Sequence, residues 1–551
     1  MKSTLRVVAI SFLFVLMDSG CTSNDPLRNK LVRADSVECP PLTAHQQSEC
    51  ASITPEVAHD LYELHFVELD SQGWLHSKPF DNTDLSGKNP PNNQIDHLMR
   101  RITDLLANQE DLNIVLYVHG WKHGAETDDK NVMLFRQLLA SMSRIERGYS
   151  SSPRRTVGIY VGWRGKSVHL PEPLISLTFW SRKSAAHRIS NGSTRELLAR
   201  LTGVQRYYNS KTNSKDCTVV ESSDVPNERC RVRMLMIGHS FGAWILYSAV
   251  HNPLIESLSG HIDLSGDRPE AGDRAERAAD MIVLVNPAFE ASTYESLHRV
   301  AHLHKASALE TPLLVSVTST SDRATRNAFP FGHFFNALFE QPVSSDEQAE
   351  AMLHTHGHIE RYVTHRLIAG DTKHCPDWVA PEAGKPRPLP VLQNNKKLEI
   401  ENNRQFLKTY TQNGLLTPEW KREFCGKMVL TQLKGKGHGI SNPNSLVWNI
   451  GTDNSVIKGH SDIMNVEFLD FIRQLYSDNA MFGHKGQSPT SVMLGNEFAK
   501  SRGILQQFDS AVTVQLILRI VNAAQERCAM LEVDLLTHAR TDKKIGTEKI
   551  I

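Results

Sequence analysis

The stretch from Arg231 to Val250, RVRMLMIGHSFGAWILYSAV, constrains the fold more than any other part of the chain. Its first half is a short continuous apolar run, which is typical of a strand buried on both faces of a parallel sheet. Its second half carries apolar residues at helical spacing and contains no proline. Gly238 and Gly242 stand two residues to either side of Ser240, so a strand and a helix can approach closely around a sharp turn. The stretch therefore predicts a strand, a strained turn bearing Ser240, and a helix.

The motif Gly-x-Ser-x-Gly at this strand-to-helix switch resembles the nucleophile elbow of the α/β-hydrolase superfamily. The resemblance implies an α/β fold of the α/β-hydrolase type: a mostly parallel central sheet flanked by helices, with cap or lid insertions. It also implies that Ser240 is a nucleophile. A chance match is the alternative, since the chain has 32 glycines, but the position between a buried strand and an apolar helix favours the elbow.

A second buried strand is predicted at Asn113–Val118, and it ends in His119-Gly120-Trp121. Many α/β-hydrolases carry His-Gly after this early strand. The resemblance implies that the backbone N–H groups of Trp121 and Phe241 form an oxyanion hole. It also implies that Gly120 lets the backbone approach the substrate carbonyl and that His119 braces the loop. The alternative is a plain turn at a strand end.

An acid and a base follow two later strands. Asp322 comes after the strand predicted at Leu313–Val317, and His460 comes after the last buried strand, predicted at Ser445–Ile450. The superfamily usually places its acid and its base at these points, so the resemblance implies a triad of Ser240, Asp322 and His460. All three side chains fall at carboxyl ends of predicted parallel strands, the edge where open α/β sheets bind ligands.

Several polar residues have competing interpretations. His438 is the rival base, but it precedes the last strand and would lie at its opposite end. Asp462 is interpreted as the N-cap of the helix that begins near Val466. Asp322 itself has the alternative role of a turn former or N-cap. No metal site is expected at His354, His356 and His358, because no carboxylate or cysteine accompanies them in a ligand pattern.

Two further stretches have open interpretations. Ala328–Phe339 is dense in aromatic residues and is either a lid or acyl-pocket wall or ordinary core packing. The helical region 181–201 carries four arginines that are expected to form a solvated face, although one of them is able to reach an anionic substrate: Arg182, Arg188, Arg195 and Arg200.

The rest of the chain suggests a domain plan. Residues 1–20 are expected to be a signal peptide, 21–55 a tether, 56–476 the hydrolase domain, and 477–551 a C-terminal helical extension. Insertions are expected at about 164–230 and 323–443. Within the domain, the sequence predicts an edge strand at Leu61–Leu69, a helix over Ile95–Leu106, strands at Arg155–Gly162 and Asp280–Val285, and mostly loop from His251 to Arg277.

The N-terminus resembles a bacterial lipoprotein signal. Lys2 and Arg6 precede a short apolar run, Val7–Met17, and small residues then lead to Cys21. The resemblance implies lipidation of Cys21, attachment to a membrane, and an outer-membrane or periplasmic location. Asp18 departs from the pattern because an aliphatic residue usually stands there, so ordinary secretion and an uncleaved anchor remain alternatives.

The other cysteines fit an exported protein. Sequence-local pairs are expected at Cys39–Cys50 and Cys217–Cys230, and Cys375–Cys425 is a looser pair. Cys528 is left over, and other connectivities remain open.

Composition and motifs together bound the function. Lys+Arg and Asp+Glu both number 61, so no basic surplus is present to attract nucleic acid. No cofactor is expected. The sequence predicts a serine hydrolase of carboxylic esters, esterase- or lipase-like, acting on a small-molecule or lipid ester. The alternatives are a thioesterase, amidase or acyltransferase with the same triad, or a non-catalytic envelope lipoprotein that uses the fold as a binding scaffold.

Overall fold

The computed structural model of the chain describes fourteen ranges: residues 26–28, 56–58, 62–75, 93–165, 179–211, 230–259, 277–304, 310–331, 345–371, 374–382, 385–412, 415–417, 419–433 and 445–481. The predicted signal peptide and almost all of the C-terminal extension lie outside these residues. So do five cysteines and one histidine named above: Cys21, Cys39, Cys50, Cys217, Cys528 and His438.

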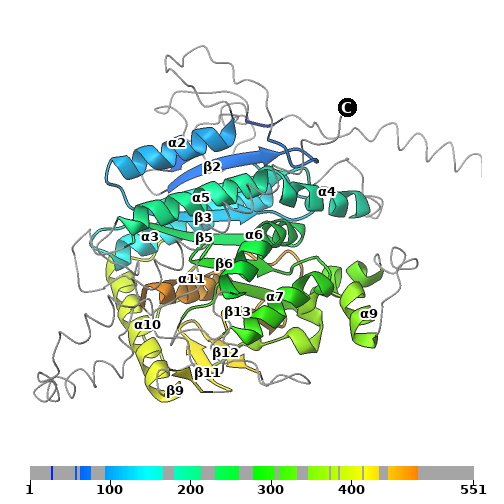
Figure 1. Cartoon of the computed structure of the whole chain (residues 1–551). Coiled ribbons are helices and arrows are strands. Elements are labelled where there is room, and N and C mark those ends of the chain that lie inside the picture. The colour runs from blue at the N-terminus through cyan, green and yellow to red at the C-terminus, as the bar shows by residue number, and fades with distance from the viewer. Residues whose placement is uncertain are drawn as a thin grey trace, which may run out of the picture. The chain divides into compact units, whose positions relative to one another are not determined.

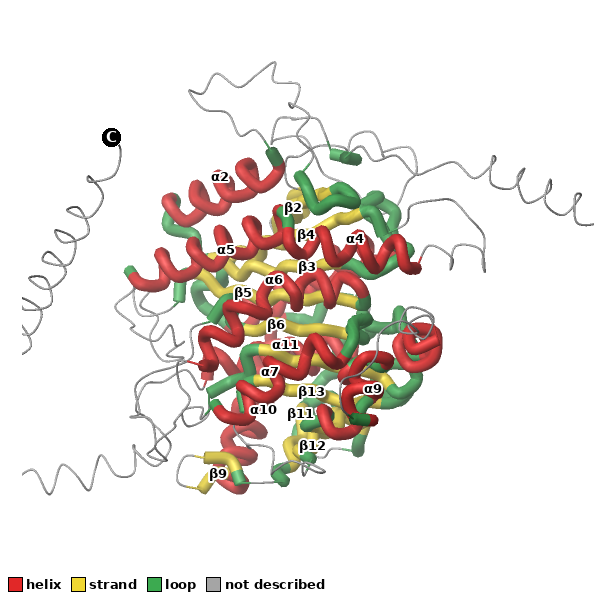
Figure 2. Tube along the Cα trace, turned by 45° about the vertical axis from the view of Figure 1, so that its right-hand side comes forward, coloured by secondary structure: helices red, strands yellow, loops and turns green. Residues whose placement is uncertain are grey.

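A large sheet forms the centre of the described residues (Figure 1). Its strands, in spatial order, are β1 (Glu56–Ala58), β2 (Tyr62–Leu69), β4 (Arg155–Trp163), β3 (Leu112–Val118), β5 (Val232–His239), β6 (Met281–Val285), β7 (Leu314–Ser319), β13 (Val447–Thr452), β8 (His365–Ala369), β12 (Met428–Gln432) and β11 (Lys421–Phe424). The strands from β2 to β8 pair in parallel, whereas β1, β12 and β11 pair antiparallel. Figure 2 shows the parallel strands in this order down the sheet. A separate small ribbon pairs β9 (Thr411–Gln412) with β10 (Leu415–Leu416).

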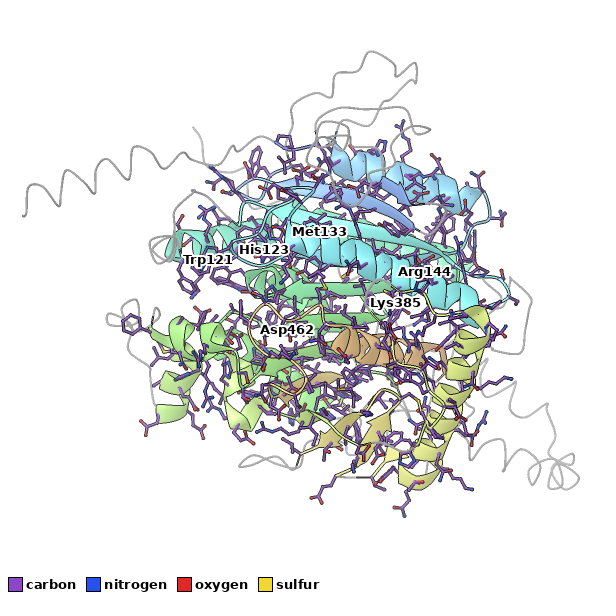
Figure 3. The ribbon with its side chains drawn as sticks, turned by 180° about the vertical axis from the view of Figure 1, so that it is seen from behind. Trp121, His123, Met133, Arg144, Lys385 and Asp462 are labelled. Atoms are coloured by element: carbon purple, nitrogen blue, oxygen red, sulfur yellow. A yellow bond between two sulfur atoms is a disulfide. The ribbon has the colours of Figure 1, made fainter. Side chains whose placement is uncertain are left out.

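Helices cover both faces of the sheet. One layer contains α2 (Gln94–Ala107), α4 (Phe179–Asn191), α5 (Ser193–Ser210), α6 (Phe241–Ser259) and α7 (Ala291–Leu303), with α9 (Asp346–Leu353) beside α7. The opposite layer contains α3 (Lys130–Tyr149), α10 (Leu389–Tyr410) and α11 (Val466–Met481). Figure 3 shows this second layer from behind, with Met133 and Arg144 on α3.

Two hydrophobic cores follow from the alternation of side chains along each strand. In β3, Ile114 and Leu116 enter the core beneath α6, whereas Val115 and Tyr117 enter the core beneath α3. Because β3, β5 and β6 at the centre of the parallel region are buried on both faces, their sequences are largely continuous apolar runs rather than alternating ones. The predicted mostly parallel α/β sheet flanked by helices is therefore confirmed.

The order of the strands creates a switch point. After β3 the chain crosses outward to β4, and β5 then pairs with the opposite side of β3. The connections that leave β3 and β5 therefore run in opposite directions, which makes the carboxyl ends of these strands a topological switch point. Ligands of open α/β sheets bind at such points. His119-Gly120-Trp121 and Ser240 are the residues that follow these two strands.

Several expectations for individual elements need correction. β2 is not the edge strand, because β1 pairs along its outer side. Helix α6 does not end near Val250 but continues past Pro253 to Ser259, because Leu254 and Leu258 extend its buried apolar stripe. The expected insertion after Asp322 adds β8, β12 and β11 to the main sheet.

The expected tether also contributes to the fold. Arg28 is buried, its guanidinium lies 3.2 Å from the centre of the Phe66 ring, and its Nη1 donates to the Ala125 carbonyl at 2.8 Å. The Glu68 carboxylate accepts hydrogen bonds from the backbone N–H groups of Leu27 and Arg28. Residues 26–28 are thus fixed against the edge of the sheet near β2 rather than being part of a free tether.

The structure bears on two of the expected disulfides and on membrane-spanning segments. The Cys375–Cys425 disulfide is present and joins segments fifty residues apart. Cys230 is disulfide-bonded, but its expected partner Cys217 lies outside the described residues, so that pairing stays a prediction. Within the part of the chain that the structure describes, no helix has the length and apolar character needed to cross a bilayer.

Candidate active site

Ser240 stands on a strained turn between β5 and α6. Its φ of +56° lies in the left-handed region, which is costly for a residue with a Cβ atom. A Cβ at Gly238 would meet the backbone of Ala243 at 2.7 Å, and one at Gly242 would lie 2.2 Å from the carbonyl oxygen of Val118. Glycines at these two positions therefore let α6 contact both β5 and β3, which is the close approach that the motif predicts.

The loop after β3 lies against this turn. A Cβ at Gly120 would lie 2.9 Å from Cβ of Ser240, so Gly120 brings the backbone before Trp121 up to the serine. Phe241 is the first residue of α6, and its amide is among those that have no acceptor inside the helix. The amide of Trp121 donates to no acceptor within the described residues. The two expected oxyanion donors are therefore available near Ser240; Figure 3 labels Trp121 on its loop.

Ser240, His460 and Asp322 form one hydrogen-bonded line. Ser240 Oγ lies 2.9 Å from His460 Nε2, and His460 Nδ1 lies 2.8 Å from Asp322 Oδ2. Asp322 is fully buried, whereas the His460 side chain is 26% exposed. Burial by itself would raise the pKa of Asp322, but hydrogen bonds from His460 and Thr325 outweigh burial and lower this pKa below its ordinary value. The carboxylate is therefore ionised near neutral pH and requires the proton on His460 Nδ1.

Two residues for which the sequence predicted no role hold His460 in place. His239 Nε2 donates to the backbone carbonyl of His460 at 2.9 Å, and Asn286 Nδ2 donates to the same oxygen at 3.1 Å. Burial lowers the pKa of His239 well below its ordinary value, so its ring is neutral and Nε2 carries the proton. We refer to His239 and Asn286 as the carbonyl clamp on His460.

The carbonyl clamp is itself tied to the neighbouring strand. Asn286 follows β6 with a φ of +45°, a conformation that asparagine tolerates better than most residues. Its Oδ1 accepts the backbone N–H of Ser319 at 3.0 Å, and Ser319 Oγ donates to the carbonyl of Ile457 at 2.7 Å. The ends of β6 and β7 are thereby joined to the loop that carries the base. The sequence signal that could have indicated this role is an asparagine directly after a predicted strand.

His119 is occupied on both ring nitrogens. Its Nε2 accepts the backbone N–H of Trp163 at 3.0 Å, so Nδ1 carries the proton and donates to the Gly120 carbonyl at 2.8 Å. Burial lowers the pKa of His119 to about 4, which keeps the ring neutral. These contacts are those of a residue that braces its loop, the role expected from the sequence.

The structure gives Asp462 a role other than the expected one. Asp462 is not the N-cap of α11, because Asn465 Oδ1 accepts the amide of Phe468 at 2.9 Å. Asp462 instead accepts the amide of Lys458 at 3.0 Å and so shapes the loop that carries His460. Local sequence does not distinguish the two candidates, because both precede the helix and both are good capping residues.

The histidine-rich stretch makes protein contacts. His356 is buried with Nε2 2.7 Å from Ser316 Oγ, and His358 Nε2 lies 2.9 Å from Thr325 Oγ1. Among the residues that the structure describes, no three histidine, cysteine, aspartate or glutamate side chains gather as a metal site would require.

Aromatic rings line the region beside Ser240. Phe179 from α4 contacts Phe241, Trp121 and Phe329, with ring centres 5.2, 5.6 and 6.1 Å away. Phe329 belongs to the predicted aromatic stretch and is buried, whereas Phe331 is 70% exposed; residues 332–339 lie outside the described part. We refer to Trp121, Phe179, Phe241 and Phe329 as the aromatic wall.

The expected arginine face is solvated only in part. Arg182 is buried, and its guanidinium donates to the Arg164 carbonyl at 2.9 Å and to Ser71 Oγ at 3.2 Å. Arg182 therefore ties α4 to the turn after β2 and is not a solvated residue. Arg188 contacts the Ser71 carbonyl, and Arg200 pairs with Asp96.

Comparisons with known proteins identify no family for the chain. The chain matches no protein-family model, no curated protein and no solved structure. What the arrangement can do follows from its groups: a hydroxyl on a strained turn, an imidazole that can take its proton, a buried carboxylate that orients the imidazole, and two amides beside the hydroxyl. Such a set is suited to nucleophilic attack on a carbonyl carbon.

The close approach of α6 and β3 can be tested with two glycines. We expect Gly242→Ala to lower the free energy of unfolding by roughly 1–3 kcal/mol, because the new Cβ would meet the backbone oxygens of Val118 and His119. Gly203→Ala in α5 is the matched control: nothing lies within 4 Å of its Cβ position, so it should stabilise by about 1 kcal/mol. Chemical denaturation measures both, and an unaltered Gly242→Ala variant would contradict the packing described.

Proposed function

We propose that the chain is a serine hydrolase with the α/β-hydrolase fold, and that it cleaves carboxylic esters through an acyl-serine intermediate. The proposal rests on two consecutive hydrogen bonds, one between Ser240 Oγ and His460 Nε2 and one between His460 Nδ1 and Asp322 Oδ2. The position of this hydrogen-bonded line supports it as well, because the three residues follow β5, β7 and β13 at the edge where such sheets bind ligands.

The mechanism follows from the positions of the protons. His460 Nε2 takes the proton of Ser240 as Oγ attacks the carbonyl carbon, and Asp322 stabilises the imidazolium that forms. The amides of Trp121 and Phe241 donate to the developing oxyanion, each contributing about 3 kcal/mol to lowering the barrier. The imidazolium then protonates the departing alcohol. Water, deprotonated by the same imidazole, releases the acid from the acyl-serine.

The aromatic wall supports an apolar substrate group. Trp121 and Phe241 provide both the proposed oxyanion amides and two rings of the wall, so a group attached to the reacting carbonyl would lie against these rings. An ester with an apolar acyl chain or alcohol fits this surface, and its hydrolysis needs no group beyond those present. A panel of oxygen esters, thioesters and amides of equal chain length would separate the ester hydrolase from the other acyl-transfer activities.

We further propose export and membrane attachment through a lipidated Cys21. The charged start, the apolar run Val7–Met17 and the small residues before Cys21 support this part of the proposal. The mass of the mature N-terminus tests it, since a chain that begins elsewhere than at a modified Cys21 would contradict lipidation.

The nucleophile can be identified with an active-site-directed fluorophosphonate. We expect covalent labelling at Ser240, and we expect Ser240→Ala to abolish labelling and lower ester hydrolysis by roughly 10⁶-fold, as loss of a triad nucleophile does. Ser257→Ala is a control, because Ser257 lies near the end of α6, away from the turn. Folded protein that hydrolyses no ester and takes no label would favour the binding scaffold over the enzyme.

The carbonyl clamp yields a separate prediction. Asn286→Gly removes the donor to the His460 carbonyl while tolerating the positive φ, and Asn286→Ala removes the donor and adds strain. Both should lower kcat/KM by about tenfold or more, because a displaced base misaligns proton transfer. The alanine variant should in addition lose about 1 kcal/mol of stability. A glycine variant with wild-type kcat/KM would mean that the backbone conformation matters and the clamp does not.

A further inference from the structure

The carboxylate of Asp322 has a second set of donors besides the base. Thr325 Oγ1 lies 2.6 Å from Oδ2, the same oxygen that His460 Nδ1 contacts. The backbone N–H groups of Ala324 and Thr325 lie 2.9 and 3.3 Å from Oδ1. Both oxygens of a buried carboxylate are thus held from its own turn, before any contribution from His460.

His358 extends the line beyond Thr325. Its Nε2 lies 2.9 Å from Thr325 Oγ1. A threonine hydroxyl has one proton, and here it points to a carboxylate that can only accept, so Thr325 must accept from His358. His358 Nε2 therefore carries a proton. Burial lowers the pKa of His358 to about 4, with Asp322 raising it and Arg326 and His354 lowering it. The ring is neutral near pH 7, which makes Nδ1 the unprotonated nitrogen.

The position of His358 is fixed by the strands that carry the acid and the base. His358 ends the 3₁₀ turn η5 (His356–His358). A Cβ on Gly357 would lie 1.9 Å from Thr318 Oγ1 on β7, so the glycine lets the turn lie flat on that strand. Asn449 on β13 donates from Nδ2 to the His356 carbonyl at 3.1 Å, and His356 contacts Ser316 on β7. The turn is therefore attached to both strands.

We propose that Thr325 and His358 are positioning residues for the triad acid, forming one hydrogen-bonded line His358–Thr325–Asp322–His460–Ser240. This inference rests on the proposed hydrolase function. The Thr325 hydroxyl holds Oδ2 in place, and His358 holds that hydroxyl with its proton directed at the carboxylate. Neither residue touches the substrate, and both act through the orientation of Asp322.

Simple capping of the helical turn after Asp322 is the competing explanation. Capping engages Oδ1, which accepts the amides of Ala324 and Thr325. The Thr325 hydroxyl engages Oδ2 instead, the oxygen that faces His460. Loss of the hydroxyl alone leaves the two amide hydrogen bonds to Oδ1 intact. It removes only the contact to Oδ2, the oxygen that His460 also contacts. The two explanations therefore predict different behaviour for variants of this one side chain.

The test compares Thr325→Val, which removes the hydroxyl at nearly constant shape, with Thr325→Ser, which keeps it. We expect Thr325→Val to lower kcat roughly ten- to hundredfold with KM within about threefold, the size expected for a hydrogen bond to a charged group. Thr325→Ser should stay within about threefold of the wild type in both constants. For His358, we expect His358→Phe to lower kcat and His358→Gln, which retains an N–H donor, to restore most of it. Thr409→Val, on the exposed side of α10, makes the same chemical change elsewhere and should leave kcat and KM unaltered.

A spectroscopic measurement on the full chain separates this inference from the proposed function. The His460 Nδ1 proton should give a far-downfield proton resonance, identified by its absence in His460→Gln. We expect this resonance to shift or broaden in Thr325→Val and to persist in Thr325→Ser. If the wild type hydrolyses no ester but the resonance responds in this way, the function is wrong and the positioning role stands. A Thr325→Val variant with wild-type resonance and kcat, or losses that follow the melting temperature and are not restored by serine, would overturn the role.

Discussion

Direct contact between the backbones of α6 and β3 is the constraint on which the site depends. Gly242 allows it, because any Cβ at that position would overlap the carbonyl oxygens of Val118 and His119. The contact brings the amide of Phe241 and the loop that carries Trp121 close to Ser240. It also forces Ser240 into a positive φ. The strain at Ser240 is maintained by two packed elements on either side of it, which is how folded proteins retain such conformations.

Around this contact the protein replaces water with fixed donors and acceptors. The Asp322 carboxylate accepts from a threonine hydroxyl, two amides and an imidazole, and the His460 carbonyl accepts from His239 and Asn286. Burial of an isolated carboxylate would favour its neutral form, but these donors keep it ionised. His460 is therefore held at its ring and at its backbone, with few alternative orientations, and a preorganised site of this kind is suited to stabilising charge that develops during a reaction.

Much of the central fold could be predicted from local sequence, and part of the site could not. Continuous apolar runs indicated β3, β5, β6, β7 and β13, because parallel strands are buried on both faces. The places of Ser240, Asp322 and His460 followed from strand ends. No role was predicted for His239, Asn286 and Thr325, because a polar residue near a strand end is usually a turn former. His358 was considered only as a metal ligand. The capping role went to Asp462 when Asn465 fills it, since both residues suit the position. Arg182 was expected to be solvated because helical spacing does not show which face a neighbouring loop covers.

The amino-acid sequence by itself determined the central strands β3, β5, β6, β7 and β13, the helix that follows Ser240, and the glycine-flanked turn at Ser240. These depend on apolar spacing and on the absence of Cβ atoms, both of which are properties of short segments. Only the tertiary structure decided that β1, β8, β12 and β11 extend the sheet and that His358 reaches the acid through Thr325. It also decided which ring nitrogen carries the proton in His119, His239 and His358. These outcomes depend on residues far apart in the chain, and the identity of a hydrogen-bond partner is set by which strands lie side by side.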